Sequence, residues 1–186
     1  MQHTIKDELT GVLVFVGAIW VVFLISRVLP ELNSYGITPR TWSGLIGIPA
    51  SPFLHLNLRH LVSNTVPLLV LLILLAGSKA RSWEIVIAVI VVGGGLLWLC
   101  GRNATHIGAS GLVFGLVAFL IVSGFLEGRI VPLLVALVVG FLYGGTLLSG
   151  VVPKMNSMVS WDGHLCGAIA GGLIAYVLTR GPPPPT

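Results

Sequence analysis

The chain has 186 residues and a formal net charge of +4, but charged side chains make up only 9% of it and hydrophobic ones 55%. Soluble domains carry roughly 25% charged residues, so this composition excludes an ordinary soluble protein and predicts an all-α membrane protein. The ten lysines and arginines are scattered singly, which argues against a surface that binds nucleic acid.

A polar N-terminal tail, residues 1–10, precedes the first apolar stretch over residues 11–29. Asp7 and Glu8 stand beside Lys6 in this tail, and no small-residue cleavage site follows the stretch. A cleaved signal peptide is therefore not expected. The first stretch should remain in the protein as a membrane span.

Five more apolar stretches follow, and each is long enough to cross a bilayer as a helix. They predict a bundle of six transmembrane helices over residues 11–179, followed by a proline-rich C-terminal tail over residues 180–186. The five stretches cover residues 60–77, 83–100, 108–126, 130–149 and 163–178.

The connection between the first two stretches, residues 30–59, is much longer than most loops. Pro39, Pro49 and Pro52 break it too often for a span. We expect an ordered loop at the membrane interface, with Trp42 as an anchor.

Positive charges do not orient the chain. If consecutive stretches cross in opposite directions, five lysines and arginines fall on each side. Long loops count less in this rule, which slightly favours cytoplasmic termini.

No metal or other cofactor is expected. His60, His164 and Cys166 are of metal-binding types, but they lack a clustered ligand spacing. Cys100 and Cys166 also form no disulfide framework, so both should be small buried side chains.

Four polar side chains stand near the starts of the second, fourth and sixth stretches: His60, Asn64, Ser110 and His164. Alternate spans are parallel, so these residues should lie at similar depth on one membrane side. Polar groups inside spans are costly and indicate function. A hydroxyl, an imidazole and an amide donor are the groups that acyl transfer requires.

Small residues at three- and four-residue spacing predict that the fourth and sixth stretches pack closely. This packing would bring the hydroxyl of Ser110 near the imidazole of His164. The alternative is a plain contact between small-residue faces, with incidental polar residues. The small residues are Gly108, Gly111, Gly115 and Ala118 in the fourth stretch, and Gly163, Gly167, Gly171 and Ala175 in the sixth.

The residue types define a mechanism. His164 would take the proton of Ser110 and later protonate the leaving amine. Asn64, His60 and the backbone N–H groups around Ser110 would stabilise the oxyanion. Asp162 is adjacent in sequence, but its reach to the imidazole is undetermined, so we predict a dyad.

These residues lie in motifs that resemble those of the rhomboid intramembrane serine proteases. The motifs are His60-Leu61-Val62-Ser63-Asn64, then Gly108-Ala109-Ser110-Gly111, then Gly163-His164-Leu165-Cys166-Gly167 with Gly171. Each is weak alone, but all three occur in order on the expected stretches. The resemblance covers nearly the whole chain.

The resemblance implies a six-helix rhomboid fold with Ser110 as nucleophile and His164 as base. It assigns Asn64, His60 and Ala109 to the oxyanion and substrate site, together with Phe114. It also implies a membrane-dipping first loop, a cap over residues 154–161 and lateral substrate entry near the second and fifth spans. The protein would be a multi-pass protein of the plasma membrane with both termini in the cytoplasm.

Two positions depart from the family pattern. Phe114 replaces a tyrosine whose ring packs on the histidine, so stacking should survive without the hydroxyl. Arg40 and Trp42 are separated and reversed relative to a Trp-Arg pair of some members, so the pattern gives them no role. His3, His55 and His106 are interpreted as structural histidines.

The expected partners are transmembrane protein substrates and the lipid bilayer. Cleavage should occur at a small residue near the surface, in segments that form weak helices. One alternative is a non-catalytic rhomboid-like protein that binds transmembrane helices, although such a protein should lose Ser110 or His164. A small transporter would need broken helices at mid-membrane, and only Gly93-Gly94-Gly95 would qualify.

Overall fold

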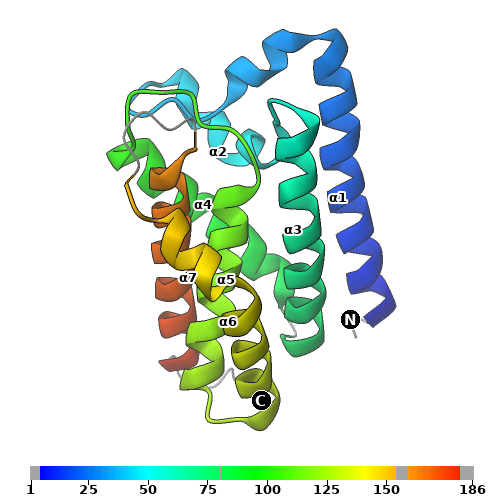
Figure 1. The fold of residues 1–186 in the computed structure, drawn as a ribbon, viewed down its shortest axis with the longest axis vertical. Helices are drawn as coiled ribbons and strands as arrows, with labels where there is room; N and C mark the ends of the chain where they lie inside the picture. Colours follow the sequence, from blue (N-terminus) through cyan, green and yellow to red (C-terminus); the bar gives the residue numbers. More distant parts are fainter. Residues whose placement is uncertain (1–4, 80, 154–158, 181–186) are drawn as a thin grey trace.

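The computed structural model describes residues 5–79, 81–153 and 159–180, and its six long helices lie side by side along one axis (Figure 1). No strand is present in these three ranges. Of the predicted tail over residues 180–186, only Arg180 is described, as the last residue of a helix. Most of the predicted cap, residues 154–158, lies outside the described ranges, as does His3. The long helices are α1 (Ile5–Val28), α3 (Leu58–Ser78), α4 (Ser82–Cys100), α5 (Ser110–Leu126), α6 (Ile130–Gly150) and α7 (Trp161–Arg180).

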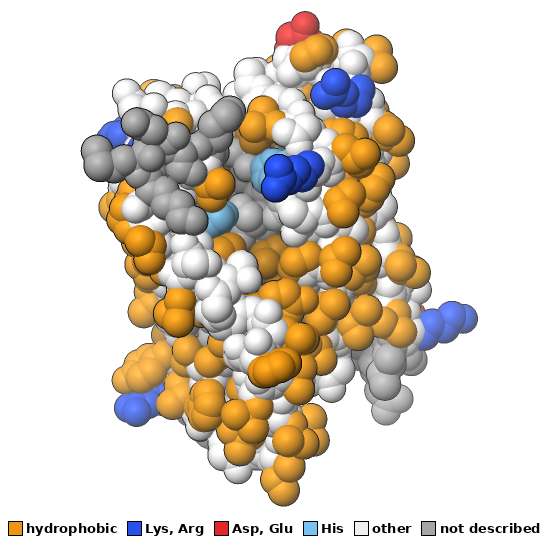
Figure 2. Space-filling view, in the orientation of Figure 1, with side chains coloured by type: hydrophobic (Ala, Val, Ile, Leu, Met, Phe, Trp, Pro, Cys, Tyr) orange, Lys and Arg blue, Asp and Glu red, His pale blue; other side chains and the backbone are white. Residues whose placement is uncertain are grey.

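Five of the long helices, all except α5, are long and apolar enough to cross a membrane. Hydrophobic side chains cover the middle of the face in Figure 2, and lysines and arginines lie toward its two ends. This distribution is typical of a protein surrounded by lipid. The described part of the chain is therefore an all-helical membrane protein.

Helix α5 is a shorter apolar helix of 17 residues at the centre of the bundle. It contacts α3, α4, α6 and α7, and its contact with α7 is the most extensive between any two described elements. Every side chain position from Leu112 to Leu120 is buried. The neighbouring helices, not lipid, therefore surround most of α5.

The helix starts differ from the predicted ones at two functional positions. Helix α5 begins at Ser110, not at residue 108, because Gly108 has a φ of 113°, outside the helical region. Helix α7 begins at Trp161, two residues before the predicted stretch. Of the two cysteines, Cys166 is buried as expected, whereas Cys100, at the end of α4, is exposed.

Short helical turns fill the connection between α1 and α3. They are η1 (Pro30–Tyr35), η2 (Ser43–Leu45), α2 (Gly47–Ala50) and η3 (Ser51–Phe53). Helix α2 packs on α4, and the Trp98 indole of α4 donates to the Thr41 carbonyl at 2.8 Å. Trp42 is 87% exposed, as a membrane anchor requires. The connection is thus docked on the helices while Trp42 points outward.

Arg40, which the motifs left without a role, attaches this connection to the end of α4. Its guanidinium donates to the carbonyl oxygens of Leu99 (3.3 Å) and Gly101 (2.9 Å), and its backbone N–H donates to Trp98 O at 3.0 Å. The last carbonyls of a helix lack partners within the helix and carry partial negative charge. Arg40 therefore caps α4, and it adopts a left-handed backbone (φ 59°) to do so.

Arg40→Ala should destabilise the protein by about 1 kcal/mol, because the α4 carbonyls lose a charged donor. Thermal unfolding in detergent measures this change. Arg27→Ala is the control, since the exposed Arg27 has no partner among the described residues. Equal unfolding temperatures for the two variants would contradict the capping role.

Candidate active site

Ser110 is the first residue of α5, and a turn at Gly108 presents it. The Gly108 N–H donates to Ser51 O at 2.8 Å, which fastens the turn to η3. A Cβ on Gly108 would lie 2.6 Å from Cε1 and Nε2 of His60. Glycine is therefore required twice here, for the positive φ and for the approach of the imidazole.

His60 and Asn64 lie one turn apart near the start of α3. The Asn57 side chain caps this helix by accepting from His60 N at 2.9 Å. Asn64 is buried, and its Nδ2 donates to His60 O at 2.7 Å. An asparagine amide carries two N–H groups, and only one of them has an acceptor among the described residues.

His164, in the first turn of α7, is held on two sides. Its Nδ1 lies 3.0 Å from the carbonyl oxygen of Gly150, and its ring stacks on Phe114 with 4.0 Å between centroids and 8° between planes. A carbonyl only accepts, so Nδ1 carries the proton in this bond. In the neutral imidazole, Nε2 is then the basic nitrogen. The stacking expected for Phe114 is present.

Glycines bring the backbones of α5 and α7 into contact. A Cβ on Gly111 would lie 3.3 Å from Gly163 O, and one on Gly115 would lie 3.0 Å from Gly167 O. Side chains at Gly167 and Gly171 would overlap the carbonyl groups of Gly111 and Gly115. Gly108 takes no part in this contact, because it lies outside α5 and faces His60.

One cavity of about 1120 Å³ brings together five of the predicted site residues. Ser110, His164, Asn64, His60 and Phe114 all line it, with residues of α6 on the remaining side. Histidine side chains are visible near the upper end of the face in Figure 2. Ala109 does not line the cavity, because its side chain is fully buried in the hydrophobic core.

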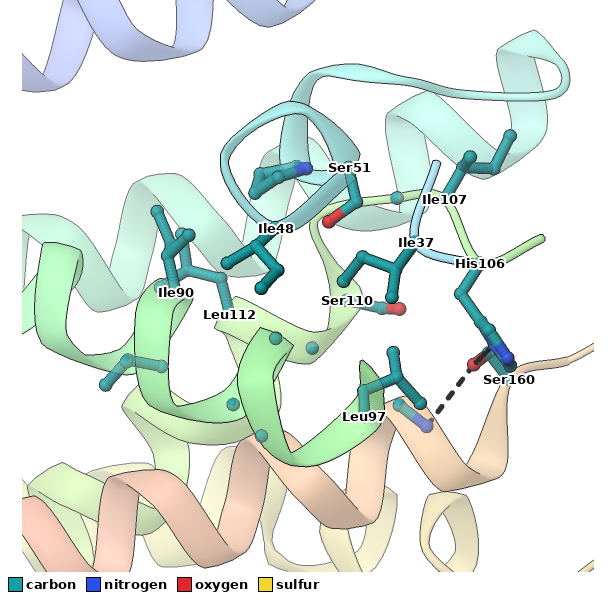
Figure 3. Close-up of a pocket in the computed structure, with 18 residues that line it drawn as sticks. Ile37, Ile48, Ser51, Ile90, Leu97, His106, Ile107, Ser110, Leu112 and Ser160 are labelled. Atoms are coloured by element: carbon teal, nitrogen blue, oxygen red, sulfur yellow. Dashed lines mark hydrogen bonds between the residues drawn. The ribbon is translucent and has the colours of Figure 1, made fainter. Parts of the chain in front are cut away.

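The structure also groups four residues that the motifs did not identify: Arg102, His106, Ser160 and Asp162. His106 and Ser160, together with Ser110, line a second cavity of about 50 Å³ behind the nucleophile (Figure 3). The Asp162 carboxylate binds Arg102, at 3.2 Å between Oδ1 and Nη2. Asp162 is thus engaged with Arg102.

His55 is completely buried, with its ring 4.9 Å from the ring of His60. Burial, with a smaller contribution from His60, lowers the pKa of His55 to about 4. The unfolded chain therefore binds a proton near pH 6.5, which the folded protein binds only near pH 4. Folding stability must fall as the pH drops through this interval.

We predict that His55→Phe reduces the loss of stability between pH 6.5 and pH 4. The expected difference in the free energy of unfolding is on the order of 3 kcal/mol at pH 4, from the pKa difference of His55. Unfolding temperatures of both proteins across this pH range provide the measurement. Parallel pH profiles would contradict the assignment to His55.

The described residues include no cluster of metal-ligand types. Among the described residues, no three of the histidine, cysteine, aspartate or glutamate side chains are close enough to hold an ion together.

Comparison with known proteins identifies one family. The family model described as "Rhomboid domain" matches residues 39–181. The uncharacterized protein Rv1337 of Mycobacterium tuberculosis is 43% identical over 182 residues, which cover 91% of this chain and 75% of that protein. The uncharacterized protein ML1171 of Mycobacterium leprae is 42% identical over 179 residues, 90% of this chain and 70% of that protein. A putative rhomboid protein, L523 of Acanthamoeba polyphaga mimivirus, is 28% identical over 137 residues, 70% of this chain and 74% of that protein.

Proposed function

Because the chain belongs to the rhomboid family, we propose that it is an intramembrane serine endopeptidase that cleaves transmembrane segments of other membrane proteins. The observation that carries this proposal is the single cavity lined by Ser110, His164, Asn64 and His60. These side chains supply a nucleophile, a base and hydrogen-bond donors in one place. The protease domain corresponds to residues 11–179.

The first step is acylation of Ser110. With Nδ1–H held by Gly150 O, Nε2 of His164 takes the hydroxyl proton while Oγ attacks the carbonyl carbon of the scissile bond. The imidazolium then gives this proton to the leaving amine, and the C–N bond breaks. The stack on Phe114 keeps the ring in one orientation throughout.

The tetrahedral intermediates carry negative charge on the former carbonyl oxygen. The free N–H of the Asn64 amide and the imidazole of His60 are donors for this oxygen, as is the backbone N–H of Ser110 at the start of α5. Water then attacks the acyl-enzyme ester, again with His164 as base, and Ser110 is released with its proton.

In the membrane, we propose that α1, α3, α4, α5, α6 and α7 are six spans. A helix of 17 residues is about 25 Å long, less than the hydrocarbon thickness of about 30 Å. If α5 ends at the far surface, Ser110 lies several ångströms beneath the near one. Hydrolysis there requires water, and the cavity provides space for it.

Substrates enter laterally between α3 and α6. These helices touch over only a few residues, and both line the cavity, α3 with Ser63 and Pro67 and α6 with Leu142 and Thr146. A helical peptide bond is shielded by its own hydrogen bonds, so segments that unwind readily are preferred, with cleavage at a small residue. The protein lies in the plasma membrane with both termini in the cytoplasm.

A reconstituted cleavage assay tests the proposal. The purified protein is placed in liposomes with a single-span substrate whose helix is weakened by glycine and proline. Wild type should release two fragments, Ser110→Ala should release none, and Ser123→Ala should match wild type. Ser123 is the other serine of α5, buried far from the cavity mouth.

Equal cleavage by wild type and Ser110→Ala would end the protease assignment. Retention of the intact substrate by all three proteins, without cleavage, would instead indicate a rhomboid-like protein that only binds transmembrane helices.

A further inference from the structure

Two segments carry the proposed catalytic residues into the bundle. The loop over residues 101–109 leads from α4 to Ser110, and residues 159–160 with the first turn of α7 lead to His164. Four side chains connect these segments: Arg102 and His106 from the first, Ser160 and Asp162 from the second. We refer to these four side chains as the loop clamp.

The first half of the loop clamp is an ion pair. Asp162 Oδ2 accepts from the Arg102 backbone N–H at 2.9 Å and from Nε at 3.3 Å, while Oδ1 accepts from Nη2 at 3.2 Å. Arg102 Nη2 also donates to Val159 O at 3.2 Å. The carboxylate is only 7% exposed. Such a bidentate and partly shielded pair fixes geometry as well as distance.

The second half is a hydrogen-bonded pair of His106 and Ser160. His106 Nδ1 lies 2.7 Å from Ser160 Oγ, and its Nε2 donates to Arg102 O at 3.1 Å. Ser160 Oγ lies 3.1 Å from Asp162 Oδ1, and it accepts from Gly163 N at 3.3 Å, the bond drawn in Figure 3.

The second half connects directly to His164 and to a third segment of the chain. Ser160 O accepts the backbone N–H of His164 at 3.0 Å. His106 exchanges two backbone hydrogen bonds with Ile37, of 2.8 and 2.9 Å, which attach its loop to the connection after α1. The loop clamp therefore joins three segments around the cavity behind Ser110.

The packing of α5 on α7 explains why such a clamp is needed. The two helices meet through glycines, so their backbones lie in direct contact. One residue of helix is 1.5 Å long, whereas proton transfer from Ser110 to His164 needs 2.6–3.2 Å between heavy atoms. A small slip of one helix along the other would therefore separate the dyad.

We propose that the loop clamp is a positioning element that sets the register between Ser110 and His164. This inference rests on the proposed function. Arg102, His106 and Ser160 also line the large cavity with Ser110 and His164. The hydrogen bonds of the loop clamp run among its own side chains and to the backbone of the two segments, so the clamp acts through these segments. The account predicts a loss of the chemical step with little loss of substrate binding.

The test compares Asp162→Asn with a matched control at the opposite end of the bundle. Asp162→Asn keeps the size of the side chain but removes the charge that holds Arg102. Glu127→Gln breaks another shielded ion pair, between Lys79 and Glu127, far from the cavity. Two readouts are used: the rate at which a small fluorophosphonate acylates Ser110, and kcat and KM for the liposome substrate.

Asp162→Asn should lower the acylation rate and kcat by about 10- to 100-fold, since an ångström of misplacement costs about this much. KM should stay within about twofold, and Glu127→Gln should leave all three quantities within about twofold of wild type. Arg102→Gln is the second variant, for use if Asp162→Asn does not fold. It should lower kcat by the same mechanism. All proteins are compared well below their unfolding temperatures.

Wild-type acylation rates and kcat in the folded Asp162 or Arg102 variant would overturn the inference, and so would a loss no larger than that of Glu127→Gln. An inactive wild-type protein that does not react with the fluorophosphonate would refute the proposed function itself, and the inference with it.

Discussion

His164→Ala is expected to lower kcat/KM for a transmembrane substrate by at least about 10³-fold. General acid–base catalysis contributes about 10²–10⁴, and the same imidazole serves both acylation and deacylation. The cavity and the donors on α3 would remain, so substrate binding should change little. Initial rates in liposomes, with separate kcat and KM, provide the measurement.

Phe114→Leu is the graded control for this prediction. It removes the stacked ring but leaves the base and its bond to Gly150 O, so the rate should fall only severalfold. A His164→Ala variant that retains activity within about tenfold of wild type would exclude His164 as the base.

Gly171→Val should disrupt the bundle and abolish cleavage. A side chain at Gly171 would overlap the carbonyl group of Gly115, so α5 and α7 must move apart. Overpacking in a core costs about 1–3 kcal/mol, and a clash with backbone cannot be relieved by a rotamer change, so a larger loss is expected. Thermal unfolding in detergent and the cleavage rate are both measured.

Gly172→Val is the matched control, because a Cβ on Gly172 has no neighbour within 4 Å. It should leave unfolding temperature and activity near those of wild type. If the two substitutions had similar effects, the contact between α5 and α7 would not explain the need for glycine at residue 171.

The main features of the fold could be predicted because each depends on local sequence. Apolar runs longer than a bilayer crossing indicate helices wherever they occur, and all six predicted stretches form helices. The rhomboid family assignment is confirmed by the matching family model. It could be predicted because the motifs that carry it are short and local. Glycine spacing also indicated the face on which α7 meets α5.

Other features depend on pairs that are far apart in sequence. His106 and Ser160 are separated by 54 positions, and neither belongs to a motif that predicts the other. The same holds for Arg40 and the end of α4, 59 positions away. Asp162 is close to His164 in sequence, but a helix start can direct a side chain either way, and here the carboxylate binds Arg102.

The central claim is that Ser110 is the activated nucleophile of this cavity. The most direct measurement is peptide mapping by mass spectrometry after reaction with a fluorophosphonate, which forms a stable bond with an activated serine. We predict one modification per chain, on Ser110, and none in His164→Ala. Modification of Ser160, which is paired with His106, or of any other serine with Ser110 unmodified would contradict the account.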